Sequence, residues 1–246
     1  MEIIKNDLRK FADADKALVL RGFFKTGVGE YGEGDVFLGV SVPNARKVAK
    51  AHGARISLDD VGRLLGSEIH EERLAGVLIL VEKFEKANCT RMALPVDSSE
   101  SHTDDADTIY EFYLKNASRI NNWDLVDLSA PKIVGEYLLG RDKDILYELA
   151  KSEDLWERRI SIVSTYAFIR AGEFEDCLGI SKILLKDSHD LIRKAVGWML
   201  REVGKRDGDL LREFLRENYS DLSRVTLRYA IERFGEDERK GWLKGH

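Results

Sequence analysis

Apolar residues recur at every third or fourth position over most of the chain, which is the spacing of one helix face and not that of a strand. Only three of the 246 residues are proline. This scarcity fits a helical chain, because a proline inside a helix costs about 3 kcal/mol. The clearest stripes are Leu74, Val77, Leu78 and Val81; Ile160, Val163, Ser164 and Ala167; and Ala195, Trp198, Met199 and Val203.

One stretch has a pattern that a strand could also produce. Val36–Val42 is rich in apolar residues, but it is short and Gly39 interrupts it. We therefore expect an extended loop that leads into a helix starting near Pro43, since proline is favoured in the first turn of a helix.

Similar segments repeat along the chain. Aligning Arg159, Lys194 and Tyr229 places three of them at a spacing of 35 residues, each with a polar or basic entry followed by an apolar run. Such units are typical of the inner helices of HEAT-type repeats. The order of residues thus predicts an all-α, right-handed α-solenoid of HEAT-like helical repeats, with a plain helical bundle as the alternative. The compared segments are Glu71–Leu78, Trp156–Val163, Leu191–Trp198 and Thr226–Ile231.

We expect residues 1–246 to form a single HEAT-like repeat domain, broken only by an acidic inter-repeat loop at about 88–107. This segment contains Pro95, several serines and no basic residue after Arg91. Such a composition is typical of a solvated loop. Its acidic residues are Asp97, Glu100, Asp104, Asp105 and Asp107.

The composition excludes several protein classes. No apolar run approaches the roughly 18 residues of a membrane span, and the charged segment Met1–Leu20 leaves no room for the apolar part of a signal peptide. Cys89 and Cys177 are the two cysteines and form no CxxC motif, which favours a reducing compartment. We expect a cytoplasmic protein that does not associate with a membrane.

Neither a metal nor a nucleotide cofactor is indicated. The five histidines never have metal-ligand spacing, and the HExxH-like start at His70-Glu71 fails because Leu74 stands where the second histidine belongs. Residues 27–32 spell GxGxxG, but the motif follows a helical segment, and the acids Glu30 and Glu33 would repel a pyrophosphate. We interpret this stretch as a flexible connector and expect no cofactor and no metal.

A set of aromatic and charged residues is more informative. On a helix, Trp123 and Asp127 share a face, and so do Trp198 and Arg201. Trp156, in contrast, is expected in the core. Equivalent positions of successive repeats line the concave surface of a solenoid. With Arg159, these residues predict a strip of two indoles, one carboxylate and two guanidinium groups, which suits a cationic group bound beside a phosphate backbone.

Net charge alone would not indicate a nucleic-acid-binding protein. The formal net charge is −5, with 18 Lys+Arg against 23 Asp+Glu in residues 1–140 and 21 of each in residues 141–246. Residues 189–206 nevertheless hold five basic and two acidic residues. Such a local basic face can bind DNA in an acidic protein, although the overall charge does not steer the encounter.

At these positions the sequence resembles the AlkD-type DNA alkylation-repair glycosylases, which are built from HEAT-like repeats. The resemblance covers residues from about Phe23 to Phe234. It departs from the family in the acidic 97–107 insertion and the glycine-rich 27–34 loop. The segments that carry it are Asn122–Asp127, Leu155–Arg159, Lys194–Glu202 and Phe37–Arg46.

The resemblance implies a role for each of the five residues. Asp127 corresponds to the catalytic aspartate, and Trp123 and Trp198 to the active-site tryptophans. Arg159 and Arg201 correspond to arginines that contact DNA phosphates. The implied activity is monofunctional hydrolysis of the N-glycosidic bond of cationic N3- or N7-alkylated purines, of the 3-methyladenine or 7-methylguanine type, in double-stranded DNA. Members of this type are reported to act without flipping the base into a pocket.

Two other functions remain open at this stage. A non-catalytic HEAT-repeat module would bind damaged DNA without releasing a base. A protein-binding scaffold would show no salt-dependent affinity for DNA. We expect a monomer that acts on duplex DNA containing alkylated bases. No lysine stands at a nucleophile position in the motifs, so no strand-cleaving lyase step is expected.

Overall fold

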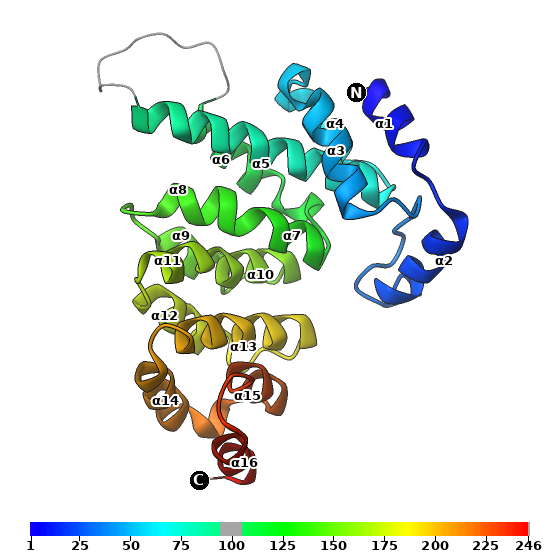
Figure 1. Ribbon diagram of the computed structural model, residues 1–246. Helices are drawn as coiled ribbons and strands as arrows, with labels where there is room; N and C mark the ends of the chain where they lie inside the picture. Colours follow the sequence, from blue (N-terminus) through cyan, green and yellow to red (C-terminus); the bar gives the residue numbers. More distant parts are fainter. Residues whose placement is uncertain (94–104, 246) are drawn as a thin grey trace. The chain divides into compact units, whose positions relative to one another are not determined.

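The computed structural model describes residues 1–93 and 105–245, which are mainly helical (Figure 1). Within these ranges there is no strand, and the one β-bridge pairs Val36 with Ile69. None of the described helices has the length and apolarity that crossing a bilayer requires. The chain divides into two compact units, Met1–Ile133 and Val134–His246, which are described in turn. A single domain over residues 1–246 stays a prediction.

The first unit is organised around one long central helix, α5. This helix packs against α1, α3, α4, α6 and α7, and its predicted stripe from Leu74 to Val81 is buried, as expected. Two 3-10 turns, Gly53–Arg55 and Ala117–Arg119, connect elements of this unit. Its helices are α1 (Glu2–Arg9), α2 (Ala14–Phe23), α3 (Val42–His52), α4 (Leu58–Leu65), α5 (His70–Ala93), α6 (Ala106–Lys115) and α7 (Trp123–Ala130).

The second unit is organised around α13. This helix packs against α10, α11, α12, α14 and α15. The 3-10 turn Tyr219–Asp221 precedes α15. A π-helical turn, Pro131–Gly135, spans the boundary between the units. The helices of the second unit are α8 (Glu136–Leu138), α9 (Asp144–Leu149), α10 (Leu155–Ser164), α11 (Tyr166–Ala171), α12 (Glu175–Leu184), α13 (Asp190–Gly204), α14 (Gly208–Glu217), α15 (Arg224–Ala230) and α16 (Glu236–Lys244).

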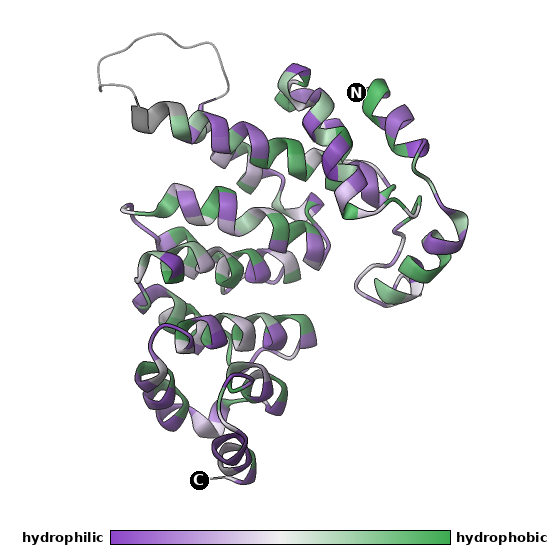
Figure 2. Cartoon of the chain, in the orientation of Figure 1, coloured by the Kyte–Doolittle hydropathy of each residue, from purple (hydrophilic) through white to green (hydrophobic). Residues whose placement is uncertain are grey.

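The predicted 35-residue spacing marks equivalent helices. Arg159, Lys194 and Tyr229 lie on α10, α13 and α15, and α13 packs against both of the others. Figure 2 shows that polar and apolar residues alternate along these helices, as one-sided burial requires. The prediction of an all-α fold built from helical repeats is therefore confirmed, and Trp156, only 7% exposed, lies in the core as expected.

Close packing of α13 on α15 depends on Gly197. A Cβ at this position would lie 2.6 Å from the carbonyl oxygen of Thr226 and 2.5 Å from Cβ of Tyr229. Both distances are shorter than van der Waals contact allows, so only glycine lets these helices approach. This glycine directly precedes Trp198 in α13, so the close helix contact lies next to that residue in the sequence.

The segment before α3 is an extended loop, as predicted. Apart from the Val36–Ile69 bridge it forms no strand, and α3 begins at Val42 with Pro43 in its first turn. The glycine-rich connector follows α2, and its own carboxylates bond its backbone: Glu30 accepts from the N–H of Gly27, and Glu33 from that of Gly29.

The expected loop at 88–107 is wrong at both ends. α5 continues through Ala93, because no helix breaker precedes Pro95, and α6 already begins at Ala106. Asp105 caps α6 by accepting a hydrogen bond from the N–H of Thr108, and Asp107 lies in the first turn, where the helix dipole favours an acid. The acids Asp97, Glu100 and Asp104 lie outside the described residues.

Candidate active-site residues

In the first unit, two of the five predicted residues lie one turn apart on α7. Asn122 caps this helix, and its side-chain oxygen accepts a hydrogen bond from the N–H of Trp123. Asp124 bonds the N–H of Leu125 in the same turn at 2.9 Å. Trp123 and Asp127 are both partly exposed, as side chains that meet a ligand must be.

The indole of Trp123 rests on a column of rings. It stacks on Phe24 with centroids 5.2 Å apart and planes at 18°, and Phe24 stacks in turn on Phe37 at 5.1 Å. Phe37 stacks on the imidazole of His70 at 4.6 Å. The ring of Phe23, which is 61% exposed, approaches Trp123 edge-on at 5.8 Å. One indole face of Trp123 is thus occupied by protein.

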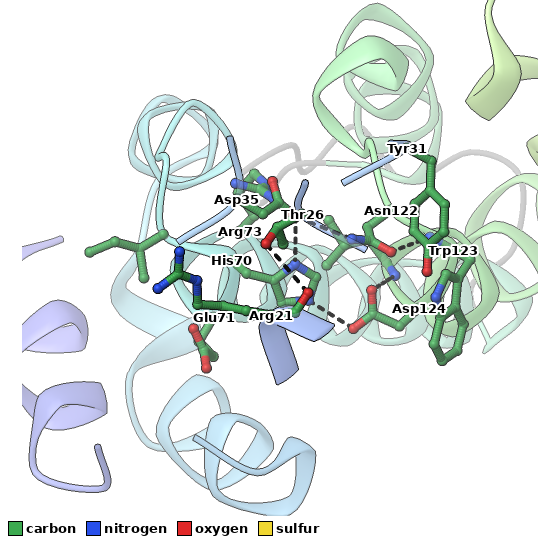
Figure 3. A network of polar contacts seen from close by, with 12 residues as sticks. Arg21, Thr26, Tyr31, Asp35, His70, Glu71, Arg73, Asn122, Trp123 and Asp124 are labelled. Atoms are coloured by element: carbon green, nitrogen blue, oxygen red, sulfur yellow. Dashed lines mark hydrogen bonds and ion pairs between the residues drawn. The ribbon is translucent and has the colours of Figure 1, made fainter. Parts of the chain in front are cut away.

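A buried polar network, shown in Figure 3, joins this column through His70. Nε2 of His70 lies 2.9 Å from a carboxylate oxygen of Asp124, and Nδ1 lies 3.3 Å from one of Asp35. Arg73 donates to the other oxygen of Asp35 at 2.6 Å, and Asn122 donates to Asp35 at 3.1 Å. All five side chains are buried, and they come from α5, α7 and the loop that precedes α3.

The network fixes the charge of His70. Both ring nitrogens face carboxylate oxygens, which accept hydrogen bonds, so both contacts are hydrogen bonds only when the ring carries a proton on each nitrogen. Burial alone would lower the pKa of His70, but the hydrogen bond and charge of Asp124 and the hydrogen bond of Asp35 raise it to about 9. Burial raises the pKa of Asp35, whereas the His70 hydrogen bond and the Arg73 charge outweigh it and hold that pKa below its usual value.

Glu71 holds the segment that leads from the network into α3. Its carboxylate accepts hydrogen bonds from the backbone N–H groups of Leu38, Gly39 and Val40 at 2.8–3.0 Å. Gly39 has φ +84°, and a side chain there would collide with the carbonyl of Asp13. A buried glutamate thus anchors three consecutive backbone amides of the segment ahead of α3.

Asp127 lies near a buried hydroxyl pair. The Tyr113 hydroxyl and the Ser129 hydroxyl are 2.8 Å apart, and Ser129 donates to the carbonyl of Leu125 at 2.6 Å. Burial raises the pKa of Tyr113 above its ordinary value, the Ser129 hydrogen bond lowers it, and the negative charge of Asp127 raises it further. Asp127 thus stands at the edge of a rigid, hydrogen-bonded part of α7.

In the second unit, Arg159 is buried between α10 and α13. Arg159 is only 5% exposed, and its Nη1 donates to the carbonyl of Leu191 at 2.6 Å. The guanidinium therefore ties the start of α13 to α10. Little of this side chain is accessible to a phosphate.

Trp198 and Arg201 lie one turn apart on α13, both partly exposed. The Trp198 indole lies 6.2 Å from the ring of Tyr166. The guanidinium of Arg201 is ion-paired with Glu232 and lies 3.6 Å from Glu202, while its Nε is buried and has no hydrogen-bond partner among the described residues. A ligand that binds Arg201 must compete with Glu232.

The predicted residues thus group by unit. Trp123 and Asp127 share α7 in the first unit, and Arg159, Trp198 and Arg201 occupy the packed helices α10 and α13 in the second. A continuous strip of all five stays a prediction. Within the described ranges no cluster of His, Cys, Asp and Glu is arranged to hold a metal ion.

Sequence reasoning missed the residues that support Trp123. Asn122 and Asp124 flank it in the motif, yet their burial was not expected, and His70 was considered only as a failed zinc ligand. Phe24 and Asp35 carry no sequence signal of their own. Their role depends on contacts between residues far apart in the sequence, for example His70 with Asp35, 35 positions away, and Phe24 with Trp123, 99 positions away.

Comparison with known proteins identifies the family of this chain and a solved structure with a similar fold. Residues 4–234 match the model of the family described as "DNA alkylation repair enzyme". The fold is similar to that of a solved structure described as "Predicted DNA alkylation repair enzyme from Enterococcus faecalis", with a TM-score of 0.67 and 14% identity over 92% of this chain and 97% of that chain. None of the curated proteins compared matches the sequence.

Proposed function

Because this chain belongs to the DNA alkylation repair enzyme family, we propose that it is a monofunctional DNA glycosylase. Its substrates are cationic purines alkylated at N3 or N7, of the 3-methyladenine and 7-methylguanine type, in duplex DNA. The observation that supports this most directly is the pair formed by Trp123 and Asp127, one turn apart and partly exposed on a helix start that a buried network holds.

The proposed chemistry asks little of the protein. An N3- or N7-alkylated purine carries a positive charge, so its glycosidic bond is already weak and the neutral base leaves readily. The transition state places positive charge on the sugar, as in the hydrolysis of other glycosides. The carboxylate of Asp127 stabilises this charge and orients the attacking water, and Ser129 and Tyr113 keep its helix turn rigid.

The tryptophans provide a surface for the sugar. The π-face of an indole is negative and favours an adjacent positive charge. Because Phe24 covers one face of Trp123, the opposite face and the ring edge are the parts that can meet deoxyribose. Trp198 plays the matching role in the second unit, where its helix is held against α15 by the contact at Gly197.

In this proposal Arg201 contacts the DNA phosphates, and Arg159 supports that contact from α10. Phosphate contacts fix the position of the DNA without reading its sequence. Arg201 meets a phosphate by exchanging Glu232 for it. Arg159 acts mainly through α13, since one of its N–H groups already bonds Leu191. Phosphate binding is thus expected to depend more on Arg201.

The deciding experiment is incubation of the protein with methylated duplex DNA, followed by chromatography for free bases. Release of 3-methyladenine or 7-methylguanine, with the abasic strand left uncut, is the expected result. Unmethylated duplex and the Asp127→Asn variant serve as controls. Binding without base release would favour a damage-binding module, and absence of salt-dependent DNA binding would favour a protein-binding scaffold.

A further inference from the structure

His70 occupies the only position in the buried network that contacts both the loop before α3 and helix α7 through one ring. Its Nδ1 faces Asp35 at 3.3 Å and its Nε2 faces Asp124 at 2.9 Å. The residue is only 2% exposed, so the ring is shielded from bulk water. The proton on each nitrogen is therefore a structural component of this part of the molecule.

We propose that the His70 imidazolium is a positioning residue that sets the first turn of α7 and thereby the indole of Trp123. As far as it concerns catalysis, this inference rests on the proposed glycosylase function. His70 itself touches neither the sugar nor the base. It acts through the two neighbours of Trp123 in the sequence and through the rings beneath the indole.

Hydrogen bonds connect the network around His70 to both residues that flank Trp123 in the sequence. Asp124, which follows it, bonds His70 with one carboxylate oxygen and the N–H of Leu125 with the other. Asn122, which precedes it, donates to Asp35 and accepts from the N–H of Trp123 itself. Rotation of the first turn of α7 would break bonds on both sides of the tryptophan.

Ring contacts also connect His70 to the side chain of Trp123. His70 stacks on Phe37, lies 5.0 Å from the ring of Phe24, and Phe24 supports the indole. Aromatic pairs of this kind contribute about 0.5–1.5 kcal/mol each beyond the area they bury. A shift of the imidazole therefore disturbs the platform of Trp123 as well as its helix.

The charges around His70 explain why its proton matters. Asp35 faces it from the loop, Asp124 from α7, and Arg73 from its own helix, so two carboxylates are matched by two cations. Glu71 points to the backbone of residues 38–40 instead, and Arg21 of α2 lines the groove beside Asp35. A neutral imidazole has one N–H and must release either Asp35 or Asp124. Asp35 keeps Arg73 and Asn122, so Asp124 is the group most affected.

The first arm of the test follows Trp123 in the free protein. The four tryptophans are labelled with 5-fluorotryptophan, and the Trp123 signal is assigned from a Trp123→Phe variant. Its ¹⁹F shift is expected to titrate with pH, with a midpoint near the His70 pKa of about 9, in the wild type. The same transition should persist in His52→Gln, whose imidazole pairs with Asp7 elsewhere in the first unit, and vanish in His70→Gln.

The second arm measures single-turnover release of 7-methylguanine at pH 7 under saturating enzyme. His70→Gln should slow release on the order of 10-fold or more while duplex affinity stays within about two-fold, since misplacement by about 1 Å can cost 10²-fold in rate. His70→Gln/Asp124→Asn, which removes the unpaired charge, should recover part of the rate. Circular dichroism and urea unfolding establish that each variant is folded.

The outcomes separate this inference from the proposed function. A Trp123 signal with no transition between pH 7.5 and 10.5 in the wild type overturns the positioning role, even if His70→Gln does not fold. Equal release rates in wild type and folded His70→Gln overturn it too. A wild type that releases no base, but whose Trp123 titrates as described, overturns the glycosylase function and leaves the positioning of Trp123 by His70 established.

Discussion

The indole of Trp123 stacks on the ring of Phe24 with their planes inclined by only 18°. This contact joins α7 to the residue that follows α2, and together with the edge-on contact of Phe23 it restricts rotation of the indole about its two side-chain bonds. The glycine-rich connector that follows Phe24 closes back on it, since the N–H of Gly32 donates to the carbonyl of Lys25. Because Phe23 and Phe24 contact Trp123, the end of α2 is part of the candidate site.

Replacing Phe24 with leucine should loosen this support. An apolar side chain remains, but the stacked pair is lost, so we expect the free energy of unfolding to fall by roughly 1–2 kcal/mol. Base release should slow several-fold because Trp123 samples more orientations. Urea unfolding and single-turnover release measure the two effects. Phe11→Leu in the same unit, whose ring lies by the Lys47 ammonium group instead, is the control. Equal release by Phe24→Leu and wild type would contradict the role of the stack.

Replacing Asp127 with asparagine should reduce catalysis more than binding. The substitution keeps the shape and removes the charge that opposes the developing oxocarbenium ion, an interaction made mainly in the transition state. Release of 7-methylguanine should fall on the order of 10²-fold or more, equivalent to about 2.7 kcal/mol of barrier. Single-turnover release under saturating enzyme measures this.

The matched control for that variant is Asp59→Asn, which removes one exposed carboxylate from α4 in the same unit. It should release the base at the wild-type rate. If Asp127→Asn does so as well, Asp127 is a structural carboxylate of α7, and the catalytic group must be sought elsewhere.

Arg201 and Glu232 should have opposite effects on DNA affinity. Arg201→Ala removes a phosphate contact, so binding to damaged and undamaged duplex should weaken alike, and the log–log salt slope should become shallower by about one. Glu232→Gln removes the competing carboxylate and should tighten binding. Titration of labelled duplex at several salt concentrations measures both.

Glu217→Gln is the control for charge, because it makes the same change on an exposed position of α14. Affinity that rises equally in both glutamine variants would indicate a general charge effect. Arg159→Ala needs a stability measurement beside the titration, since the loss of its bond to Leu191 also loosens α13.

Gly197→Ala should destabilise the second unit even though alanine favours helix formation by about 1 kcal/mol over glycine. The added methyl group meets the Thr226 carbonyl oxygen at 2.6 Å, and separating α13 from α15 costs roughly 1–3 kcal/mol. Gly22→Ala on α2 has nothing within 4 Å of its new Cβ and should be neutral or stabilising. Thermal unfolding of the two variants gives the comparison, and similar values would show that the helices can separate without cost.

The free energy of unfolding should fall at alkaline pH as His70 loses its proton. Its folded-state pKa of about 9 lies above the ordinary 6.5, so its contribution is fully present below pH 6.5 and is lost as the pH rises through 9. The stability difference between wild type and His70→Gln should therefore shrink by on the order of 3 kcal/mol between pH 6 and pH 10. Urea unfolding at intervals of pH measures it, and a difference independent of pH would exclude a charged His70 in the folded state.

The local sequence pattern by itself determined that the chain is helical and that similar helices recur along it. The stripes on α5, α10 and α13 and the 35-residue spacing of Arg159, Lys194 and Tyr229 reflect a helical period that each segment expresses by itself. The spacing of Trp123 and Asp127 on α7 is of the same kind, because residues four apart share a helix face wherever the helix lies. The end of α5 was misjudged because polar residues at 88–93 are compatible with both a helix end and a loop.

Only the tertiary structure decided what surrounds those residues. The sequence contains His70, Asp35 and Asp124, but their charges depend on burial and on contacts between three separate elements. Likewise the sequence shows Arg201 only as a basic residue on a helix face. The structure shows that Glu232, in the segment after α15, forms an ion pair with it. Electrostatic energies depend on distance and on exposure to water, and neither is set by position along the chain.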